Sequence, residues 1–228
     1  MTKLKLQVRL FQRFLLDFFA GVHFRWAKIP KQELLLPYST QQKQEIKAST
    51  HFENKLFNLQ LAAERINGVV LLPNQIFSFW KMVGPPNSDF KSGRTLVGGK
   101  VKEDVGGGIC QVSGLIYQTC LSAGLHILER HNHSVDLYTD ETRFAPLGMD
   151  ATVAYGYKDL RIKNPFPFPL QMNLKILGNE LFLTLKSKEN LIFLPLVSEV
   201  QHFEKSLKVQ VWRNQELMST SEYQKLVE

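Results

Sequence analysis

The sequence predicts an α+β fold in which two main helices pack on an antiparallel β-meander and a cysteine lies at the N-terminus of the second helix. Apolar residues recur at helical spacing in two segments of the first half, whereas apolar and polar residues alternate in the second half. Helices and strands do not alternate along the chain, which counts against a doubly wound parallel sheet. The 228 residues can bury a sizeable core without disulfides or a structural metal.

Residues 1–49 are interpreted as a basic amphipathic segment followed by a connector. The first fifty residues contain nine Lys or Arg and three Asp or Glu, whereas the other 178 carry 19 basic and 18 acidic side chains. Basic residues are therefore not clustered through the folded part, which excludes a general nucleic-acid-binding surface. Because no 18-residue apolar stretch is present, we expect a location in the cytoplasm or at the membrane periphery.

Two interpretations of the N-terminal segment remain open. Its apolar residues recur at helical spacing, namely Leu10, Phe11, Phe14, Leu15, Phe18, Phe19 and Val22. One interpretation is an interfacial helix within residues 1–25 that lies on an anionic membrane. The other is a helix that packs its apolar face on the domain and exposes its basic residues to solvent. The second interpretation is favoured, because amphipathic helices packed on a core are common.

Residues 50–187 are expected to form the central domain, which begins with a helix up to about residue 66. Thr50 and Glu53 have the spacing of a capping box, and Gly68 is a stop signal. A short strand over residues 69–72, a buried cluster over 75–83 and an irregular glycine-rich stretch over 91–108 follow. The second helix starts near Cys110 and ends at Gly124.

The remaining pattern is that of strands. Candidates are residues 125–129, 135–138, 151–155 and 160–162, and the clearest hairpin joins residues 170–176 to 181–185 through a Gly-Asn turn. Residues 188–228 are a C-terminal extension, with possible strands at 191–196 and 209–212 followed by a polar tail.

The most informative segment for chemistry is Gly106-Gly107-Gly108-Ile109-Cys110-Gln111. A cysteine at a helix N-terminus is favoured as thiolate by the macrodipole, so Cys110 is the candidate nucleophile. Backbone N–H groups near Gly107 and Gly108, together with Gln111, are the candidate oxyanion site. The competing interpretation is a small buried residue after a tight turn, since free cysteines are usually inert. Cys120 lies ten residues further along the same predicted helix, about 15 Å away, which argues against a disulfide between the two.

A general base is expected in the segment Glu129-Arg130-His131-Asn132-His133-Ser134. His131 and His133 share a face if this segment is extended, and Asp150 is the first candidate to orient the imidazole, with Asp159 second. A zinc site formed by both histidines with Cys110 or Asp150 is a competing hypothesis, but the spacing is generic. We expect no metal and no cofactor.

These motifs resemble the VanW family, over residues 58–185. The resemblance rests on Phe77-Ser78-Phe79, on the Gly-Gly-Gly-Ile-Cys-Gln block, on Arg130-His131-Asn132-His133-Ser134 and on Gly148-Met149-Asp150-Ala151-Thr152. The family takes its name from an accessory protein of vancomycin-resistance clusters, so the resemblance implies the bacterial cell envelope and peptidoglycan as context. Asn74 departs from the family pattern, in which a glycine follows the proline. The Arg-x-x-His-Ser frame favours His133 over His131 as the base.

The leading hypothesis is a cell-envelope-associated thiol hydrolase or acyl transferase that acts on peptidoglycan-type peptides. Cys110 is its nucleophile, His133 its base and Asp150 the residue that orients the base. The first alternative is a non-enzymatic cell-wall or ligand-binding module, and the second is a peripheral membrane accessory that acts through residues 1–25. The sequence predicts neither the exact substrate nor the oligomeric state.

Overall fold

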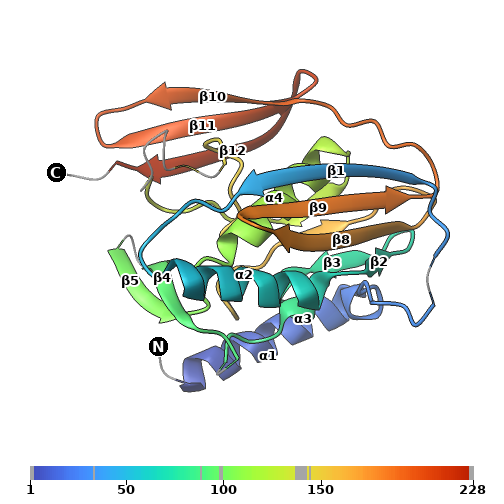
Figure 1. The fold of residues 1–228 in the computed structure, drawn as a ribbon, viewed down its shortest axis with the longest axis horizontal. Coiled ribbons are helices and arrows are strands. Elements are labelled where there is room, and N and C mark those ends of the chain that lie inside the picture. The colour runs from blue at the N-terminus through green and yellow to red at the C-terminus, as the bar shows by residue number, and fades with distance from the viewer. Residues whose placement is uncertain are drawn as a thin grey trace.

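The computed structural model describes residues 3–32, 34–87, 89–97, 100–136, 143 and 145–225, and it confirms the α+β class (Figure 1). The α-helices are α1 (Lys3–Phe19), α2 (Phe52–Ile66), α3 (Phe79–Val83) and α4 (Cys110–Ser122), and η1 (Val22–Phe24) is a 3-10 turn. None of the described helices is long and apolar enough to cross a bilayer.

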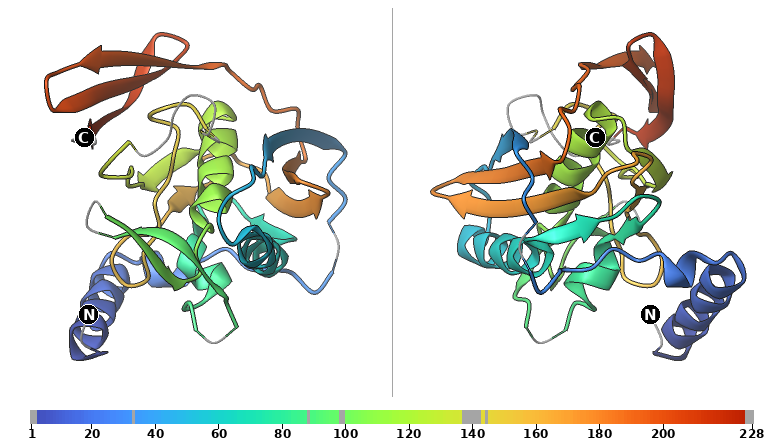
Figure 2. Two further views of the ribbon diagram at one scale, coloured as in Figure 1. Left: turned by 60° about the vertical axis from the view of Figure 1, so that its left-hand side comes forward. Right: turned by 90° about the vertical axis from the view of Figure 1, so that its right-hand side faces the viewer.

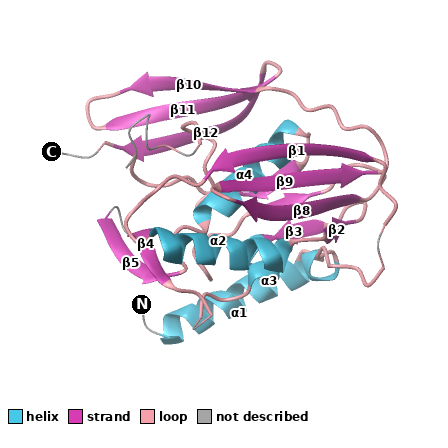
Figure 3. Ribbon diagram, in the orientation of Figure 1, coloured by secondary structure: helices cyan, strands magenta, loops and turns pink. Residues whose placement is uncertain are grey.

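Within the described residues, the strands form four separate antiparallel sheets, whose strands are magenta in Figure 3, instead of one meander. The largest sheet has the order β1 (Tyr38–Glu45), β9 (Glu180–Ser187), β8 (Leu170–Leu177), β2 (Val69–Leu71). A second contains β3 (Ile76–Ser78), β7 (Arg161–Lys163) and β6 (His126–Glu129). β4 (Ser92–Val97) pairs with β5 (Lys100–Val105), and the C-terminal sheet consists of β10 (Leu196–His202), β11 (Ser206–Arg213) and β12 (Glu216–Gln224).

Helix α4 lies at the centre of the molecule (Figure 2). Eleven of its thirteen residues are buried, and it packs on α2, β1, β6 and β9. The predicted hairpin of β8 and β9 is confirmed. Its alternating leucines Leu181, Leu183 and Leu185 are buried in the same core as Leu115 and Ile116 of α4. This central position fixes the helix N-terminus, which begins at Cys110.

Hydrophobic patterns in the sequence did not predict several strands that are held mainly by backbone pairing. β1 has the polar sequence Tyr-Ser-Thr-Gln-Gln-Lys-Gln-Glu, yet it pairs with β9 along all eight residues as an edge strand. β4 and β5 form a hairpin within the stretch predicted to be irregular. β12 replaces the predicted polar tail and pairs with β11. Such strands do not need an apolar face along their whole length, so alternation does not reveal them.

Other local predictions were wrong. The capping box does not form: α2 begins after His51, which has a positive φ of 60° and no capping side-chain bond. Residues 151–155 are not a strand: the carbonyl of Ala151 accepts from Ser113 of α4, Ala154 forms an isolated bridge with Lys158, and Tyr155 lies in a turn. Residues 191–195 are also outside any strand. Of the predicted strand 135–138, Val135 forms an isolated bridge with Gln224, while residues 137 and 138 lie outside the described residues.

Helix α1 runs along the outside of the molecule (Figures 1 and 2). The face that it turns inward combines Leu6 and Leu10 with the charged residues Arg13 and Asp17. Asp17, its one buried residue, forms a bidentate ion pair with Arg161 of β7 at 2.6 and 3.0 Å. Arg13 pairs with Glu129 of β6 at 2.5 Å. The expectation that the apolar face packs on the domain is therefore wrong, because ion pairs to β6 and β7 set the orientation of the helix.

Candidate functional site

The three glycines before α4 allow the backbone to pass against another strand. A Cβ atom on Gly107 would lie 2.2 Å from the carbonyl carbon of Gly93 in β4, so any larger residue would force the two backbones apart. Gly106 has a φ of +84°, which other L-residues rarely adopt. Asn58, fully buried on α2, donates to the carbonyls of Lys91 and Gly107 and accepts from the N–H of Lys91. These contacts hold the loop in place at the start of α4.

The N-terminus of α4 carries backbone donors without protein partners. Among the described residues, Ile109 and Gln111 donate to the carbonyls of Gly106 and Gly108, but the N–H groups of Gly107, Gly108 and Cys110 form no hydrogen bond. Free N–H groups at a helix N-terminus, together with the helix dipole, favour negative charge nearby. They are available to an anionic sulfur or to a developing oxyanion beside it.

The segment that contains Asp150 runs alongside α4. Gln118 donates to the carbonyl of Met149 at 3.1 Å, and Ser113 donates to that of Ala151 at 2.6 Å. The sulfur of Cys110 lies 3.9 Å from the carbonyl of Val153. Through these contacts α4 positions its first residue and the Asp150 loop relative to each other.

His133 connects Cys110 to Asp150. Its Nδ1 lies 2.6 Å from Oδ2 of Asp150, and the Cys110 side chain is near enough to the ring to contribute to its pKa. Because Asp150 occupies Nδ1, Nε2 is the ring nitrogen left for the thiol. Burial alone lowers the pKa of His133. The hydrogen bonds to Asp150 and Cys110 and the negative charges of both partners outweigh burial and raise that pKa from 6.5 to about 10. At neutral pH the imidazolium form is therefore favoured.

Asp150 is held as a carboxylate by His133, the partner that the sequence predicted, and by Arg130 and Tyr223, which sequence reasoning did not assign. Burial opposes its ionisation, but the hydrogen bond and charge of His133, the charge of Arg130 and a hydrogen bond from Tyr223 together keep its pKa well below the usual 3.8. Arg130 donates to the Asp150 carbonyl and carboxylate at 2.7 and 2.9 Å, and to the carbonyl of Gly148 at 2.8 Å. Tyr223 donates to Oδ1 of Asp150 and accepts from the N–H of Gly148.

The C-terminal sheet therefore completes the surroundings of Asp150. Tyr223 and Ser221 both lie on β12, and Ser221 accepts a hydrogen bond from Arg130. Gly148 packs so tightly on β11 that a Cβ there would lie 2.7 Å from Val211 and 2.8 Å from Val209. Arg130 stood in a motif that the sequence already singled out, whereas nothing in the polar C-terminal sequence indicated a role for Tyr223.

The other candidate residues have different partners. His131 forms a hydrogen bond with Glu129 at 3.1 Å, whereas His133 binds Asp150, so the two histidines have different partners. Asp159 is buried and binds Ser78, the N–H of Trp80 and Arg161, which makes it the N-terminal anchor of α3 and not a partner of His133. Burial raises its pKa.

Gln111 does not offer its amide to the space around the thiol. Its Nε2 donates to the carbonyl of Glu45 on β1 at 2.7 Å, and its side chain is almost completely buried. The predicted contribution of the Gln111 side chain to an oxyanion site is therefore wrong, because β1 already uses the donor. The helix N-terminus keeps only its backbone N–H groups for that role.

The two cysteines differ in their environment. Both are free; Cys110 is partly exposed and Cys120 is completely buried in the core. Burial strongly raises the pKa of the Cys120 thiol. Within the described part of the chain, no group of three His, Cys, Asp or Glu side chains is arranged to hold a metal ion.

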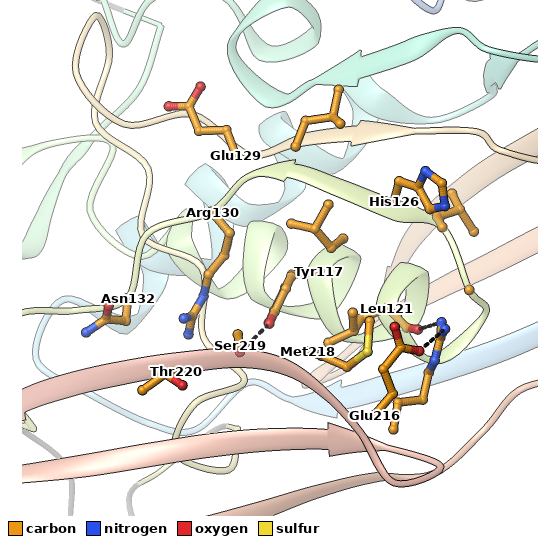
Figure 4. Close-up of a pocket in the computed structure, with 15 residues that line it drawn as sticks. Tyr117, Leu121, His126, Glu129, Arg130, Asn132, Glu216, Met218, Ser219 and Thr220 are labelled. Carbon is orange, nitrogen blue, oxygen red and sulfur yellow. Dashed lines mark hydrogen bonds and ion pairs between the residues drawn. The ribbon is translucent and has the colours of Figure 1, made fainter.

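A polar cleft of about 490 Å³ lies on the other side of Arg130, between the C-terminal half of α4, β6 and β12 (Figure 4). Arg130 stacks on Tyr117 with 5.0 Å between the guanidinium carbon and the ring centroid. Asn132, Arg213 and Glu216 also line the cleft. Cys110, His133 and Asp150 are not among the residues that line the cleft. Arg130 lines the cleft and also binds Asp150, so it connects the two.

Comparison with known proteins gives matches in one family. A family model described as VanW like protein matches residues 54–186. Uncharacterized protein YoaR of Bacillus subtilis is 37% identical over 161 residues, which cover 69% of this chain and 52% of YoaR. Vancomycin B-type resistance protein VanW of Enterococcus faecalis is 39% identical over 114 residues, 49% of this chain and 42% of that protein. The chain thus spans about half the length of these relatives, and no solved structure matches it.

Proposed function

Since the chain belongs to the VanW-like family, we propose that it is a cell-envelope-associated thiol enzyme that hydrolyses or transfers acyl groups of peptidoglycan-type peptides. The observation that carries the proposal is the hydrogen bond of His133 to the buried carboxylate of Asp150, on an imidazole whose pKa also responds to the partly exposed Cys110. The printed name of one relative, vancomycin B-type resistance protein VanW, supports a link to vancomycin resistance, and peptidoglycan-type peptides as the substrate class are part of the proposal.

The first chemical step is attack by the thiolate. The Cys110 sulfur adds to the carbonyl carbon of the scissile peptide bond, and the carbonyl oxygen becomes an oxyanion. The unpaired N–H groups of Gly107, Gly108 and Cys110 at the start of α4 supply donors for that oxygen. A donor of this kind typically contributes about 10²–10³ in rate.

The second step needs an acid, and the third needs a base. The imidazolium of His133 gives its proton to the leaving amine, the C–N bond breaks, and a thioester on Cys110 remains. Neutral His133 then takes a proton from water, or from an acceptor amine in a transfer reaction, and the thioester is cleaved to regenerate the thiolate and imidazolium. Asp150 keeps the ring oriented through both steps.

A binding module is the second candidate function. The polar cleft of about 490 Å³ beside Arg130 favours it, because that cleft is lined by Asn132, Arg213 and Glu216 and does not include Cys110. In this case the cleft holds a peptide or glycan of the cell wall, and Cys110 has no chemical role.

Intact-mass measurement tests the proposal. The full chain is incubated with a mixture of peptidoglycan-derived peptides, quenched with acid, and examined for a thioester adduct. We expect an adduct on Cys110 that is absent in Cys110→Ala and retained in the matched variant Cys120→Ala. Peptides that bind to the protein equally well in all three forms, without adduct or cleavage, would contradict the enzyme proposal and favour the binding module.

A further inference from the structure

Helix α1 has the reverse of the usual orientation for a surface helix. Side chains at positions 6, 10, 13 and 17 face the body of the protein, at the i, i+4, i+7 spacing of one helix face. Two of these four are ionic: Arg13 pairs with Glu129, and Asp17 pairs with Arg161. Leu6 and Leu10 pack on Gly156, where an added Cβ would lie 2.4 Å from Leu6.

The opposite face of α1 is apolar and exposed. Phe19 is 82% exposed, Leu4 71% and Phe11 60%. Further exposed apolar residues of the helix and the following turn are Val8, Phe14, Leu16, Phe18 and Phe24. Phe18 contacts both Phe19 and Phe24, with ring centroids 5.7 and 6.0 Å apart, so the aromatic rings form one group. A contiguous apolar surface of this kind that is exposed to solvent marks an interaction site.

Basic side chains accompany this apolar face. Lys3, Lys5 and Arg25 form no ion pair with any described residue. Asp17, the one acidic residue of α1, is already neutralised by Arg161. The surface therefore combines exposed aromatic and aliphatic groups with unneutralised positive charge, which is the combination that anionic lipid headgroups and their acyl boundary attract.

We infer that α1 lies in the surface of an anionic membrane, with Phe11, Phe19 and their apolar neighbours inserted among the lipids. The seventeen-residue helix is about 25 Å long and would lie parallel to the membrane plane. The ion pairs of Arg13 and Asp17 hold the protein body on the opposite side of the helix, so the helix does not need to detach to bind. The inference is independent of the proposed chemistry at Cys110.

Vesicle binding of the full chain tests the inference. Wild type should co-sediment with vesicles that mix phosphatidylglycerol with phosphatidylcholine, and much less with phosphatidylcholine alone. The double variant Phe11→Asp/Phe19→Asp should lower the partition coefficient about 10-fold or more, because two large apolar groups no longer insert. Lys3→Glu/Lys5→Glu should lower binding only to the anionic vesicles, and raising salt to about 1 M should have the same effect.

A matched control changes apolar surface elsewhere. Ile192→Asp/Phe203→Asp replaces two residues that are 75% and 51% exposed near the C-terminal sheet, and it should bind vesicles like wild type. Urea unfolding midpoints equal to that of wild type show that the α1 variants are folded. Equal binding by wild type and Phe11→Asp/Phe19→Asp would overturn the inference. So would a wild-type dimer in sedimentation velocity that this variant dissociates, since α1 would then contact a second copy.

Discussion

The same carboxylate oxygen of Asp150 accepts two hydrogen bonds from His133, one from the ring Nδ1 at 2.6 Å and one from the backbone N–H at 2.7 Å. Two bonds to one residue fix both the position of its backbone and the rotation of its ring. The imidazole is thereby held in one orientation before any substrate arrives. Preorganisation of this kind is what a thiol enzyme needs from its third residue.

Alkylation with iodoacetamide should distinguish the two cysteines. Cys110 is partly exposed and starts helix α4, whereas burial both shields Cys120 and raises the pKa of its thiol. We expect rapid labelling of Cys110 and almost none of Cys120 at neutral pH, measured by peptide mass spectrometry. Equal and slow labelling of both in the native protein would count against a nucleophilic role.

The stability of the protein should depend on pH through His133. The folded-state pKa of about 10 lies above the unfolded value of 6.5, so the folded form holds the extra proton between them. The stabilisation by His133 is complete below about pH 6.5 and is lost as the pH rises toward 10. The buried thiol of Cys120 adds a similar slope at alkaline pH, so the informative quantity is the difference between wild type and a variant.

That difference is measured by urea unfolding at several pH values. His133→Asn should show a shallower decline of the unfolding free energy than wild type across this range, whereas His131→Asn should keep the wild-type slope. At the acid end, stability should fall as the pH drops below about 3.8, because the unfolded chain then takes up a proton on Asp150 that the folded state, with its lowered pKa, does not. Identical slopes for wild type and His133→Asn would show that the ion pair is not formed in solution.

Much of the candidate site could be predicted from the sequence, because residues able to act as nucleophile, base or carboxylate lie in short motifs. The Gly-Gly-Gly-Ile-Cys-Gln and Met-Asp-Ala-Thr blocks led to Cys110, to Asp150 and to the family, and the match over residues 54–186 confirms the family. Tyr223 could not be found this way, because its role depends on a β12 strand that pairs through its backbone. The orientation of α1 could not be predicted either. It depends on ion pairs of Arg13 and Asp17 with Glu129 and Arg161, which lie more than a hundred residues away in sequence.

Tyr223 should act as a positioning residue for Asp150. Tyr223→Phe keeps the ring but removes the donor to Asp150 and the acceptor for Gly148, at a cost of about 1–3 kcal/mol in the unfolding free energy. Loss of that donor should also lower the pKa of His133, measured by NMR titration of its ring protons, because a less fixed carboxylate stabilises imidazolium less well. Tyr157→Phe, on a tyrosine remote from Asp150, is the control. A stability loss without any change in the His133 titration would leave Tyr223 a purely structural residue.

The glycine loop should tolerate no side chain at its centre. Gly107→Ala would place a Cβ 2.2 Å from the backbone of Gly93, so a loss of about 1–3 kcal/mol or more is expected from urea unfolding. Gly178→Ala is the comparison: it has a positive φ but open space around it, and strain alone should cost about 1 kcal/mol. Equal losses would show that the close approach of the two backbones is not what requires glycine.

The pairing of Cys110 with His133 is tested most directly by the pH dependence of Cys110 alkylation. In wild type we expect rapid alkylation at neutral pH, because the raised pKa of His133 keeps its ring as an imidazolium near the partly exposed Cys110. His133→Ala should move the rate profile to higher pH while the protein stays folded, and His131→Ala, whose ring binds Glu129, should leave it in place. A profile that moves with His131→Ala and not with His133→Ala, or that moves with neither, would contradict the account.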